Sequence, residues 1–497
     1  LGRAWLGGAG RREAAPALAV AHEELFADGG ALTDAWGDFD GDGDPDRFVG
    51  FNGTPSRLYR NDLLDGFVDV APDVGLVVER AVRTAAWGDF DADGDPDLLL
   101  GYAGDAPVTA LWRNDGAGGF TEVAGRVGLR LEEGATRQAS WIDFDGDGDL
   151  DLFLALRDGP NRLFRNDAGA FTDVAPELGL DDPRRTVGAV WFDADRDGRL
   201  DVVVANMDGD ANGLWIQSED GFRDVAAGTE LAAGGRALGD EDQGTVRPCV
   251  ADYDADGVFD VFTANYGPNG LLRGTLADSL PAFTNVAGEL GLAVDGRWDT
   301  CAFADYDHDG DLDVYVNGTV VRGRNYPDYL FRQDEGRFFD ETPAELRDLP
   351  SDHGATWVDF DLDGDLDLAL AGAAPGEEGM HYLVQNLLRP EFAGHALTVR
   401  VLDEAGHATH PGAEIRVYAA GTSDLLASAL VDSGSGYDAQ GDLPVHFGLP
   451  GGEPVDVVVT TLRGGRRNDT RVEGVDPEEH RGRPLVLRID RRGDLAG

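Results

Sequence analysis

The chain has 497 residues and a formal net charge of −53 at pH 7, from 94 acidic and 41 basic side chains. This acidic excess argues against nucleic acid as a partner, because phosphate binding needs a basic surface. The sequence contains no run of about 18 apolar residues, the length that a membrane-spanning helix needs. The chain is long enough to build several cores or one large repetitive core.

Residues 1–20 are rich in Gly, Ala and Arg and begin with Leu, which indicates a tail or linker left by export processing. Every basic residue of the chain is Arg. Together with the abundant Ala, Gly and Asp, this composition is typical of a high-GC, salt-adapted (halophilic) organism; a secreted protein of another high-GC organism is the alternative. We therefore expect an exported protein that is extracellular or held at the cell surface.

The segment Asp38–Asp46 carries carboxylates at positions 1, 3, 5 and 9 of a nine-residue loop, with Gly43 at position 6. Calcium takes about six to eight oxygen ligands, which alternate side chains of a tightly curled loop can supply. Glycine at position 6 permits the backbone reversal that returns the last carboxylate to the ion. The residue at position 7 can add its backbone carbonyl oxygen. Without an ion the carboxylates would repel one another, so the loop is predicted to bind calcium.

The pattern occurs seven times, at starts 50 to 59 residues apart, and we number the copies loops 1 to 7. Repetition at this spacing favours metal binding over solvated Asp-Gly turns, the alternative that one copy would leave open. The predicted ligands of about seven structural Ca²⁺ ions are Asp38, Asp40, Asp42, Asp44 and Asp46; Asp89, Asp91, Asp93, Asp95 and Asp97; Asp143, Asp145, Asp147, Asp149 and Asp151; Asp193, Asp195, Asp197, Arg199 and Asp201; Asp252, Asp254, Asp256, Val258 and Asp260; Asp305, Asp307, Asp309, Asp311 and Asp313; Asp359, Asp361, Asp363, Asp365 and Asp367.

Each loop belongs to a repeat with one plan. An apolar stretch precedes the loop, with an aromatic residue two positions before the first Asp in six copies, which we expect to fill the core between repeats. A short β-branched run follows the loop, then a strand ending in Arg-Asn-Asp, then a Gly-Phe-x-Asp-Val-Ala strand. Four strands per repeat of about 50 residues are typical of β-propeller blades. The sequence therefore predicts an all-β fold, with a seven-bladed propeller over residues 21–392.

The seventh repeat lacks its own fourth strand. A partial copy, Glu24–Asp28, stands at the start of the chain, so an N-terminal strand is predicted to complete the last blade and close the ring. The Asn-Asp pairs between third and fourth strands are interpreted as hairpin turns. From about Gly394 the loops stop, and short strands at 396–401, 414–418, 455–459 and 485–489 predict a small β-sandwich-like domain over 393–491, followed by a tail at 492–497.

The Asp-x-Asp-x-Asp-Gly-x-x-Asp loops resemble the FG-GAP or VCBS repeats of integrin-type propellers. The C-terminal segments 395–401, 411–417 and 433–449 resemble the ASPIC/UnbV domain. The combination is similar to that of the cartilage-acidic-protein-like family. The resemblance implies a calcium-loaded extracellular propeller used for binding or adhesion. Arg199 and Val258 depart from Asp at position 7, which a ligand that binds through its carbonyl tolerates.

Cys249 and Cys301 lie three and four residues before loops 5 and 6, in comparable strands of consecutive repeats. A disulfide and a pair of buried small hydrophobic residues are equally compatible with that placement. Their spacing fits no zinc or redox motif.

The segments that enter the innermost strands of a propeller line one mouth of its channel. Several cationic side chains fall there, and Arg suits carboxylates, sulfates or phosphates. An anionic glycan or similar ligand could bind at this mouth; pairing of these Arg residues with neighbouring Asp is the alternative. The candidate ligand-binding residues are Arg83, Arg137, Arg185, Arg247, Trp298, Asp299 and His353.

No nucleophile–base pair, zinc triad or phosphate loop is recognisable, and the Gly-rich segment 433–437 lacks the strand-to-helix context of a nucleophile elbow. No catalytic residue is therefore predicted. The leading hypothesis is a calcium-binding surface or matrix protein with a glycan or protein ligand. The alternatives are a structural subunit of a calcium-dependent, self-associating assembly and a cofactor-free enzyme that uses the channel mouth.

Overall fold

The structure is a computed structural model that describes residues 15–496, except residues 103, 105, 117–118, 278–279, 322, 348, 350–352, 373–380, 432–438 and 491. Most of residues 1–20, the glycine-rich segment 433–437 and residue 497 therefore lie outside the described residues. Each α-helix of the described part has only four residues. None of these helices could span a membrane. The expected all-β class is confirmed.

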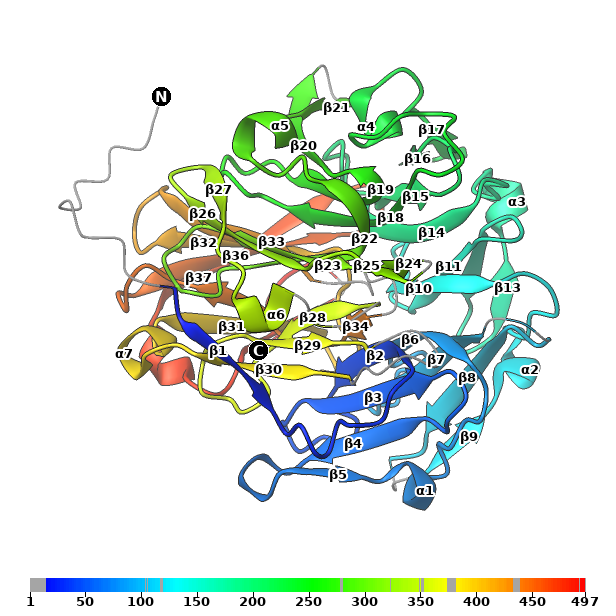
Figure 1. The fold of residues 1–497 in the computed structure, drawn as a ribbon, viewed down its shortest axis with the longest axis horizontal. Coiled ribbons are helices and arrows are strands. Elements are labelled where there is room, and N and C mark those ends of the chain that lie inside the picture. The colour runs from blue at the N-terminus through cyan, green and yellow to red at the C-terminus, as the bar shows by residue number, and fades with distance from the viewer. Residues whose placement is uncertain are drawn as a thin grey trace.

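The first part of the chain forms small antiparallel sheets in which each strand pairs with the next, and Figure 1 shows these sheets around a common centre. Their strands are β2 (Ala31–Gly37), β3 (Asp46–Phe51), β4 (Arg57–Asn61) and β5 (Phe67–Asp69); β6 (Val82–Gly88), β7 (Asp97–Tyr102), β8 (Thr109–Asn114) and β9 (Phe120–Glu122); β10 (Thr136–Ile142), β11 (Asp151–Leu156), β12 (Arg162–Asn166) and β13 (Phe171–Asp173); β14 (Thr186–Phe192), β15 (Asp201–Asn206), β16 (Gly213–Ser218) and β17 (Gly221–Asp224); β18 (Gly244–Ala251), β19 (Asp260–Pro268), β20 (Gly270–Ala277) and β21 (Leu280–Asn285); β22 (Asp295–Ala304), β23 (Asp313–Gly318), β26 (Tyr329–Asp334) and β27 (Arg337–Asp340); β28 (Ala355–Val358), β29 (Asp367–Leu370) and β30 (Leu383–Leu387).

This arrangement of four-stranded sheets is consistent with the predicted propeller. Second strands such as β3, β7 and β11 are buried on both faces, which explains their largely apolar sequences. The fifth and sixth groups are joined into one larger sheet because β19 also pairs with β22. A short hairpin, in which β24 (Val320–Val321) and β25 (Arg324–Asn325) have two residues each, follows β23 in the sixth group.

An N-terminal strand completes the last of these sheets. Strand β1 (Ala17–Ala21) pairs antiparallel with β30 along five residues. This strand begins inside the segment interpreted as a tail, whereas Glu24–Asp28, the segment predicted to form the closing strand, is not a strand. Leu18 packs in the cluster between the sixth and last sheets, and Phe26 is buried beside His381 and Tyr59. The partial sequence match therefore marked a buried aromatic anchor rather than the closing strand.

Short helices follow most of the outermost strands: α1 (Ala71–Val74), α2 (Ala124–Val127), α3 (Ala175–Leu178), α4 (Glu230–Ala233), α5 (Ala287–Leu290) and α6 (Ala344–Arg347). The Asp of the Phe-x-Asp-Val pattern begins the first of them, since the Oδ1 atom of Asp69 accepts a hydrogen bond from the Ala71 amide at 3.2 Å. Gly75 ends the helix with φ 78°, a left-handed conformation that glycine adopts without strain. The 3-10 turn η1 (Leu63–Asp65) connects β4 to β5.

The C-terminal part forms two further sheets, which we call the C-terminal sheets. They contain β31 (Ala396–Asp403), β35 (Val445–Gly448) and β38 (Leu485–Ile489) in one sheet, and β32 (Glu414–Ala419), β33 (Leu425–Leu430), β36 (Val455–Leu462) and β37 (Arg467–Val475) in the other; α7 (Pro390–Ala393) precedes them and η2 (Pro477–His480) precedes β38. Their inward residues share one hydrophobic core. The four strands predicted from the sequence are present.

Strand β34 (Ala439–Gly441) leaves the C-terminal sheets and enters the ring. It pairs parallel with β2, so that Trp36 aligns with Gly441. It also contacts β6 and β28, the first strands of two other sheets. In Figure 1 it lies at the common centre. A piece of the C-terminal segment therefore occupies the middle of the ring.

The aromatic residues before the loops form the core between sheets, as expected. Trp36, Trp87, Trp141, Trp191 and Trp357 are at most 8% exposed. Three of them also cross to the preceding sheet, because the indole N–H donates to a backbone carbonyl there, as Trp87 does to Ala35 at 3.3 Å.

A disulfide joins Cys249 in β18 to Cys301 in β22. It links the first strands of the fifth and sixth groups, the same two groups that β19 and β22 join through hydrogen bonds. The sequence left open whether Cys249 and Cys301 form a disulfide or stay reduced, and in the structure they form the disulfide.

Candidate functional site

Each Asp loop connects the first strand of a sheet to the second, and all seven have the same backbone shape. Position 6 is a glycine with φ between 84° and 104°, as predicted. Position 4 also has positive φ, between 50° and 76°, although it is glycine only in loops 1 and 3. The non-glycine residues held in this costly conformation are Ala92, Arg196, Ala255, His308 and Leu362. This second reversal was not predicted from the sequence, although Gly41 and Gly146 were an available signal for it.

The position 1 carboxylate holds the loop closed from inside. In loop 2 its two oxygens accept hydrogen bonds from the amides of Asp93 at 3.1 Å and Gly94 at 2.8 Å. The same pair of bonds is formed by Asp252, Asp305 and Asp359. Alternate carboxylates are thereby turned toward one centre.

The position 9 carboxylate joins the loop to the third strand. The Oδ2 atom of Asp151 accepts from the amide of Phe144 at 3.1 Å, and its Oδ1 atom accepts from the amide of Asn166 at 2.8 Å. Equivalent bonds to the third strand are made by Asp46, Asp97, Asp201, Asp260, Asp313 and Asp367. This carboxylate therefore has a structural role in the sheet in addition to any ligand role, which the sequence pattern alone did not reveal.

The position 3 carboxylate divides its two oxygens between a side chain of the third strand and the loop interior. In loop 6 the Arg332 guanidinium donates to Asp307 Oδ2, and in loop 7 the Gln385 amide donates to Asp361 Oδ2 at 2.8 Å. Arg113 and Arg273 pair with Asp91 and Asp254 in the same way. Within the described residues the other oxygen, Oδ1, is buried without a hydrogen-bond partner in Asp91, Asp254, Asp307 and Asp361.

Further buried carboxylate oxygens without a hydrogen-bond partner, in the part of the chain that the structure describes, belong to Asp143, Asp193, Asp365 and Asp367. An acceptor buried in this way costs free energy unless a cation or donor satisfies it. In the loops, groups of three carboxylates place oxygens within 4.8 Å of one another, as in Asp89, Asp91 and Asp97. The donor set of hard oxygens, the spacing and the unsatisfied atoms all fit a divalent cation.

The electrostatics agree with the geometry. Burial, together with the charges of neighbouring loop carboxylates, raises the pKa of Asp89 to about 6 and that of Asp97 to about 9. The same causes raise the pKa of Asp151 to about 9. Carboxylates that resist ionisation in this way gain the most from a bound cation, because the cation favours their charged form.

The loop backbone keeps its shape where position 7 is not Asp. The backbone amides of Arg199 and Val258 donate to the position 5 carboxylates at 2.9 Å and 2.8 Å, as an Asp at this position does. The Arg199 side chain pairs with the position 5 carboxylate of Asp197. The loop conformation is thus kept at both departures from the pattern.

The candidate ligand residues of the channel mouth are not gathered at one site. Trp298 is 1% exposed and its indole donates to the Pro327 carbonyl at 3.3 Å, so it belongs to the core. Arg247 is buried and donates to Thr300 and to the Ala355 carbonyl. Arg83 is half-buried in β6.

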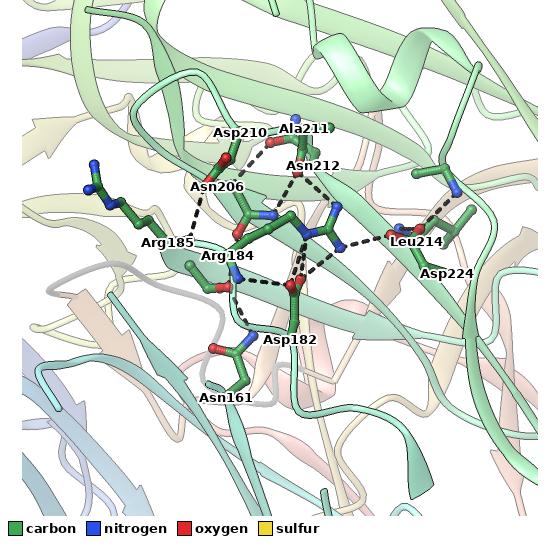
Figure 2. A network of polar contacts seen from close by, with 12 residues as sticks. Asn161, Asp182, Arg184, Arg185, Asn206, Asp210, Ala211, Asn212, Leu214 and Asp224 are labelled. Carbon is green, nitrogen blue, oxygen red and sulfur yellow. Dashed lines mark hydrogen bonds and ion pairs between the residues drawn. The ribbon is translucent and has the colours of Figure 1, made fainter. Parts of the chain in front are cut away.

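Other cations of the mouth are paired with acids. Arg185 lies 2.7 Å from Asp208. Figure 2 shows its neighbour Arg184 between Asp182 and Asp224, at 2.7 Å and 2.8 Å. The pairing that the sequence left as an alternative is thus present for these residues.

A small cavity of about 180 Å³ remains at the mouth, lined by Arg137, Arg297 and Asp299 among others. Asp299 also lies 3.5 Å from the Nδ1 atom of His353. A larger cavity of about 1540 Å³ lies between the Asp loops and the C-terminal sheets, where Asp38, Asp89, Arg400 and His407 line it.

Comparison with known proteins places the chain among repeat proteins. The FG-GAP-like repeat matches five overlapping stretches, residues 38–100, 89–154, 143–204, 193–263 and 252–316. Together these run without a gap from 38 to 316, which is more than half of the chain.

Cartilage acidic protein 1 of Mus musculus is 26% identical over 320 residues, which cover 62% of this chain and 39% of the relative. The Xenopus tropicalis protein of the same name is 26% identical and the Homo sapiens protein 25%, over 65% and 66% of this chain. The matches span between 39% and 51% of the relatives' own length.

Two solved structures resemble this chain only weakly, with TM-scores below 0.5. A complex of BBS1N with ARL6DN has 8% identity and a TM-score of 0.46, covering 76% of this chain and 98% of that one. The exotype rhamnogalacturonan lyase YesX has 15% identity and a TM-score of 0.37, covering 91% and 82%. The family assignment rests on the repeats and the relatives, which confirm the resemblance seen in the sequence. The chain belongs to the FG-GAP-like repeat family and is related to cartilage acidic protein 1.

Proposed function

We propose that this protein is an exported, calcium-stabilised, seven-bladed β-propeller that acts as a binding or adhesion protein at the cell surface or in the extracellular matrix. In this proposal, residues 21–392 with β1 form the propeller, residues 393–491 form a second, ASPIC/UnbV-like β-domain, and about seven Ca²⁺ ions occupy the loops. Support for the extracellular setting comes from the disulfide between Cys249 and Cys301, since disulfides persist in oxidising compartments.

One observation carries the calcium proposal. Among the described residues, buried carboxylate oxygens without a hydrogen-bond partner recur at position 3 of four loops, in Asp91, Asp254, Asp307 and Asp361. A bound calcium ion would supply positive charge and open coordination positions to these oxygens. The carboxylates at positions 1, 3, 5 and 9, with the position 7 carbonyl, would hold it.

The protein's own residues prepare this site. Position 1 carboxylates fix the loop backbone, third-strand Arg or Gln side chains orient the position 3 carboxylates, and position 9 carboxylates attach the loop to the sheet. A site that is held from several sides in this way needs little reorganisation when the ion binds. The repetition favours a structural role, in which each ion stabilises the turn between the first two strands of a sheet.

Ligand binding is proposed at the channel mouth on the side away from the loops, around Arg137 and the small cavity it lines with Arg297 and Asp299. Because both charge signs line this cavity, a ligand with a carboxylate or sulfate beside a hydroxyl or amine, such as an acidic glycan or a protein side chain, is the proposed class.

The calcium proposal is tested on the full chain purified in calcium and then dialysed into metal-free, low-salt buffer. We expect several equivalents of tightly held calcium per chain by elemental analysis, and a lower melting temperature after a chelator is added. Retention of no calcium together with an unchanged melting curve would refute the proposal.

The ligand proposal is tested separately, with an array of acidic glycans and Arg137→Ala as the matched variant. Binding by the wild-type chain that the variant loses would support it. An array without hits, or hits that the variant retains, would reject this mouth as the site.

A further inference from the structure

The C-terminal sheets lie against the Asp loops, and the contacts recur around the ring. His407 Nδ1 lies 2.9 Å from the Ala92 carbonyl of loop 2, and the Gly464 backbone lies beside Gly146 of loop 3. Arg467 and Ser428 donate to Asp193 of loop 4 and to Asp252 of loop 5. The His446 ring lies 5.4 Å from the His308 ring of loop 6, and His446 Nε2 lies 3.1 Å from the Gly364 carbonyl of loop 7. Among the described residues, no hydrogen bond or ion pair joins loop 1 to these sheets.

In loop 5 the contact is made to a predicted metal ligand. The hydroxyl of Ser428, in β33, donates a hydrogen bond to Asp252 Oδ2. The same carboxylate accepts from the amides of Asp256 at 3.0 Å and Gly257 at 3.1 Å. Asp252 and Ser428 are 3% and 4% exposed, so water does not compete for this bond. The position 1 carboxylate is thus oriented partly by its own loop and partly by the C-terminal sheets.

In loop 4 an arginine makes the equivalent contact. Arg467 Nη1 donates to Asp193 Oδ2 at 2.5 Å, and both terminal nitrogens of Arg467 bond to the Glu414 carboxylate at 2.8 Å and 2.7 Å. Glu414 offsets the charge of Arg467, which therefore acts on Asp193 as a fixed donor. The remaining oxygen, Asp193 Oδ1, belongs to a fully buried side chain and has no hydrogen-bond partner in the described structure. A buried oxygen that has no hydrogen-bond partner and is held in place through the other oxygen of its carboxylate is suited to bind a cation.

We propose that loops 4 and 5 are shared metal sites, in which Arg467 and Ser428 of the C-terminal sheets are positioning residues for the position 1 ligands Asp193 and Asp252. This inference rests on the proposed calcium role of the loops. Hydrogen-bonding partners of metal ligands fix ligand orientation and contribute strongly to affinity. Binding of the ion and seating of the C-terminal sheets must then stabilise each other, because thermodynamic coupling between two equilibria is reciprocal.

Loop 5 offers the sharper test, because Ser428 is uncharged and its removal leaves the charge of the site unchanged. Ser428→Ala deletes only the hydroxyl. Ser423→Ala is the matched control, since Ser423 is exposed in the turn before β33. Loop 1 is a control within the same molecule, because in the described part of the chain no hydrogen bond or ion pair joins it to the C-terminal sheets.

The experiment follows hydrogen–deuterium exchange of the full-length protein by mass spectrometry while calcium is titrated. We expect exchange in peptides of 252–260 and of β33 to slow with calcium at one common midpoint in the wild type. In Ser428→Ala the calcium concentration at the midpoint for 252–260 should rise by about tenfold. The midpoint concentration for 38–46 should stay unchanged, and Ser423→Ala should change neither midpoint.

The possible failures are distinguishable. An unchanged midpoint for 252–260 in Ser428→Ala, or an equal shift in loops 1 and 5, would overturn the shared site and leave calcium binding intact. Absence of any calcium response at loops 1 and 5 in the wild type would instead overturn the proposed calcium function. A response of loop 5 without one in β33 would contradict the coupling to the C-terminal sheets.

Discussion

Asp151 illustrates how one residue serves both the sheet and the loop. Its two oxygens accept amide hydrogen bonds from Phe144 and Asn166, which tie the loop to the second and third strands. Asp147, at position 5 of the same loop, is exposed and accepts from the Asp149 amide at 2.9 Å. Both aspartates are predicted ligands of the same ion, but only Asp151 also bonds to the third strand. Substitution of each residue can therefore separate ion binding from stabilisation of the sheet.

We predict that, above about pH 9 where Asp151 is ionised, Asp151→Asn lowers the free energy of unfolding by about 2 kcal/mol even in chelator, because the new amide group faces a backbone N–H in a buried position. Asp147→Asn should cost stability in calcium and little or none in chelator, where it removes a repelling charge. Urea unfolding of both variants, with and without calcium, checks this. Equal losses for the two variants in chelator would contradict the structural role assigned to position 9.

His381 gives a residue-scale dependence on pH. Burial lowers its pKa well below 6.5, and the charge of Arg47 lowers it further. Its two ring nitrogens lie 3.2 Å from the Asp28 carbonyl and the Tyr59 hydroxyl, an arrangement that suits the neutral ring. A histidine that is neutral when folded takes up a proton only on unfolding, so its contribution is present above pH 6.5 and is lost as the pH falls below that value.

We predict that the unfolding free energy of the wild type falls more steeply below pH 6.5 than that of His381→Gln, by up to about 1.4 kcal/mol per pH unit. The difference between the two proteins isolates this proton from the loop carboxylates, which both retain. Denaturant unfolding at pH 7, 6 and 5 in saturating calcium measures it. Parallel curves for the two proteins would exclude His381 as a source of the dependence.

At the scale of the elements, an Asn or Gln at the Asn position of the Arg-Asn-Asp pattern links most of the sheets to their predecessors, whereas the fifth group has Gly274 there. The side chain of Asn166 donates to the Phe90 carbonyl of the preceding sheet at 2.8 Å, and its Oδ1 atom accepts from the Gly169 amide at 2.7 Å. The same cross-sheet bond is made by Asn61, Asn114, Gln217, Gln333 and Asn386. The bond from Asn61 reaches Phe360, the second residue of loop 7, and thus joins the first sheet to the last.

We predict that Asn166→Ala destabilises the protein by about 2 kcal/mol, since it leaves two carbonyls and one amide of the loop and turn without their partner. Asn52→Ala is the matched control, because Asn52 is exposed, and should change stability by less than about 0.5 kcal/mol. Thermal and urea unfolding in calcium compare the two. A loss for Asn166→Ala no larger than for the control would show that packing alone joins the sheets.

The repeating elements could be predicted from the sequence because the same pattern of residues recurs in each repeat. The four strands, the Asp loops and the core Trp residues follow from spacing and alternation. The interpretation of Asn166 as a turn residue captured only its Oδ1 bond; the Nδ2 bond crosses to Phe90, 76 residues away, and no local pattern encodes such a distance. The position of β1 was also missed, because Ala17–Ala21 is too short and plain to outweigh the partial match at Glu24–Asp28.

The candidate site was predictable in its ligands and not in its surroundings. The Asp residues were evident because a run of carboxylates around a glycine has few other uses. Hydrogen bonds from Arg467 to Asp193 and from Ser428 to Asp252 join segments that are far apart in sequence. No local pattern in either segment predicts these contacts. The mouth residues were predicted from their positions near the start of each repeat, and the burial of Trp298 and Arg247 shows that such a position does not ensure exposure.

For the whole molecule, the net charge of −53 makes stability depend on ions, and the seven loops concentrate much of that charge. We predict that in chelator the melting temperature rises steeply between about 0.1 M and 1 M NaCl, as the screening length falls from about 10 Å to about 3 Å. In saturating calcium the rise should be much smaller, because bound ions neutralise the loops at short range, where mobile salt acts weakly. Differential scanning calorimetry at both salt concentrations, with and without calcium, measures the four values. Equal salt responses in the two conditions would place the destabilising repulsion on the general surface rather than in the loops, and would remove the main physical reason for seven ions.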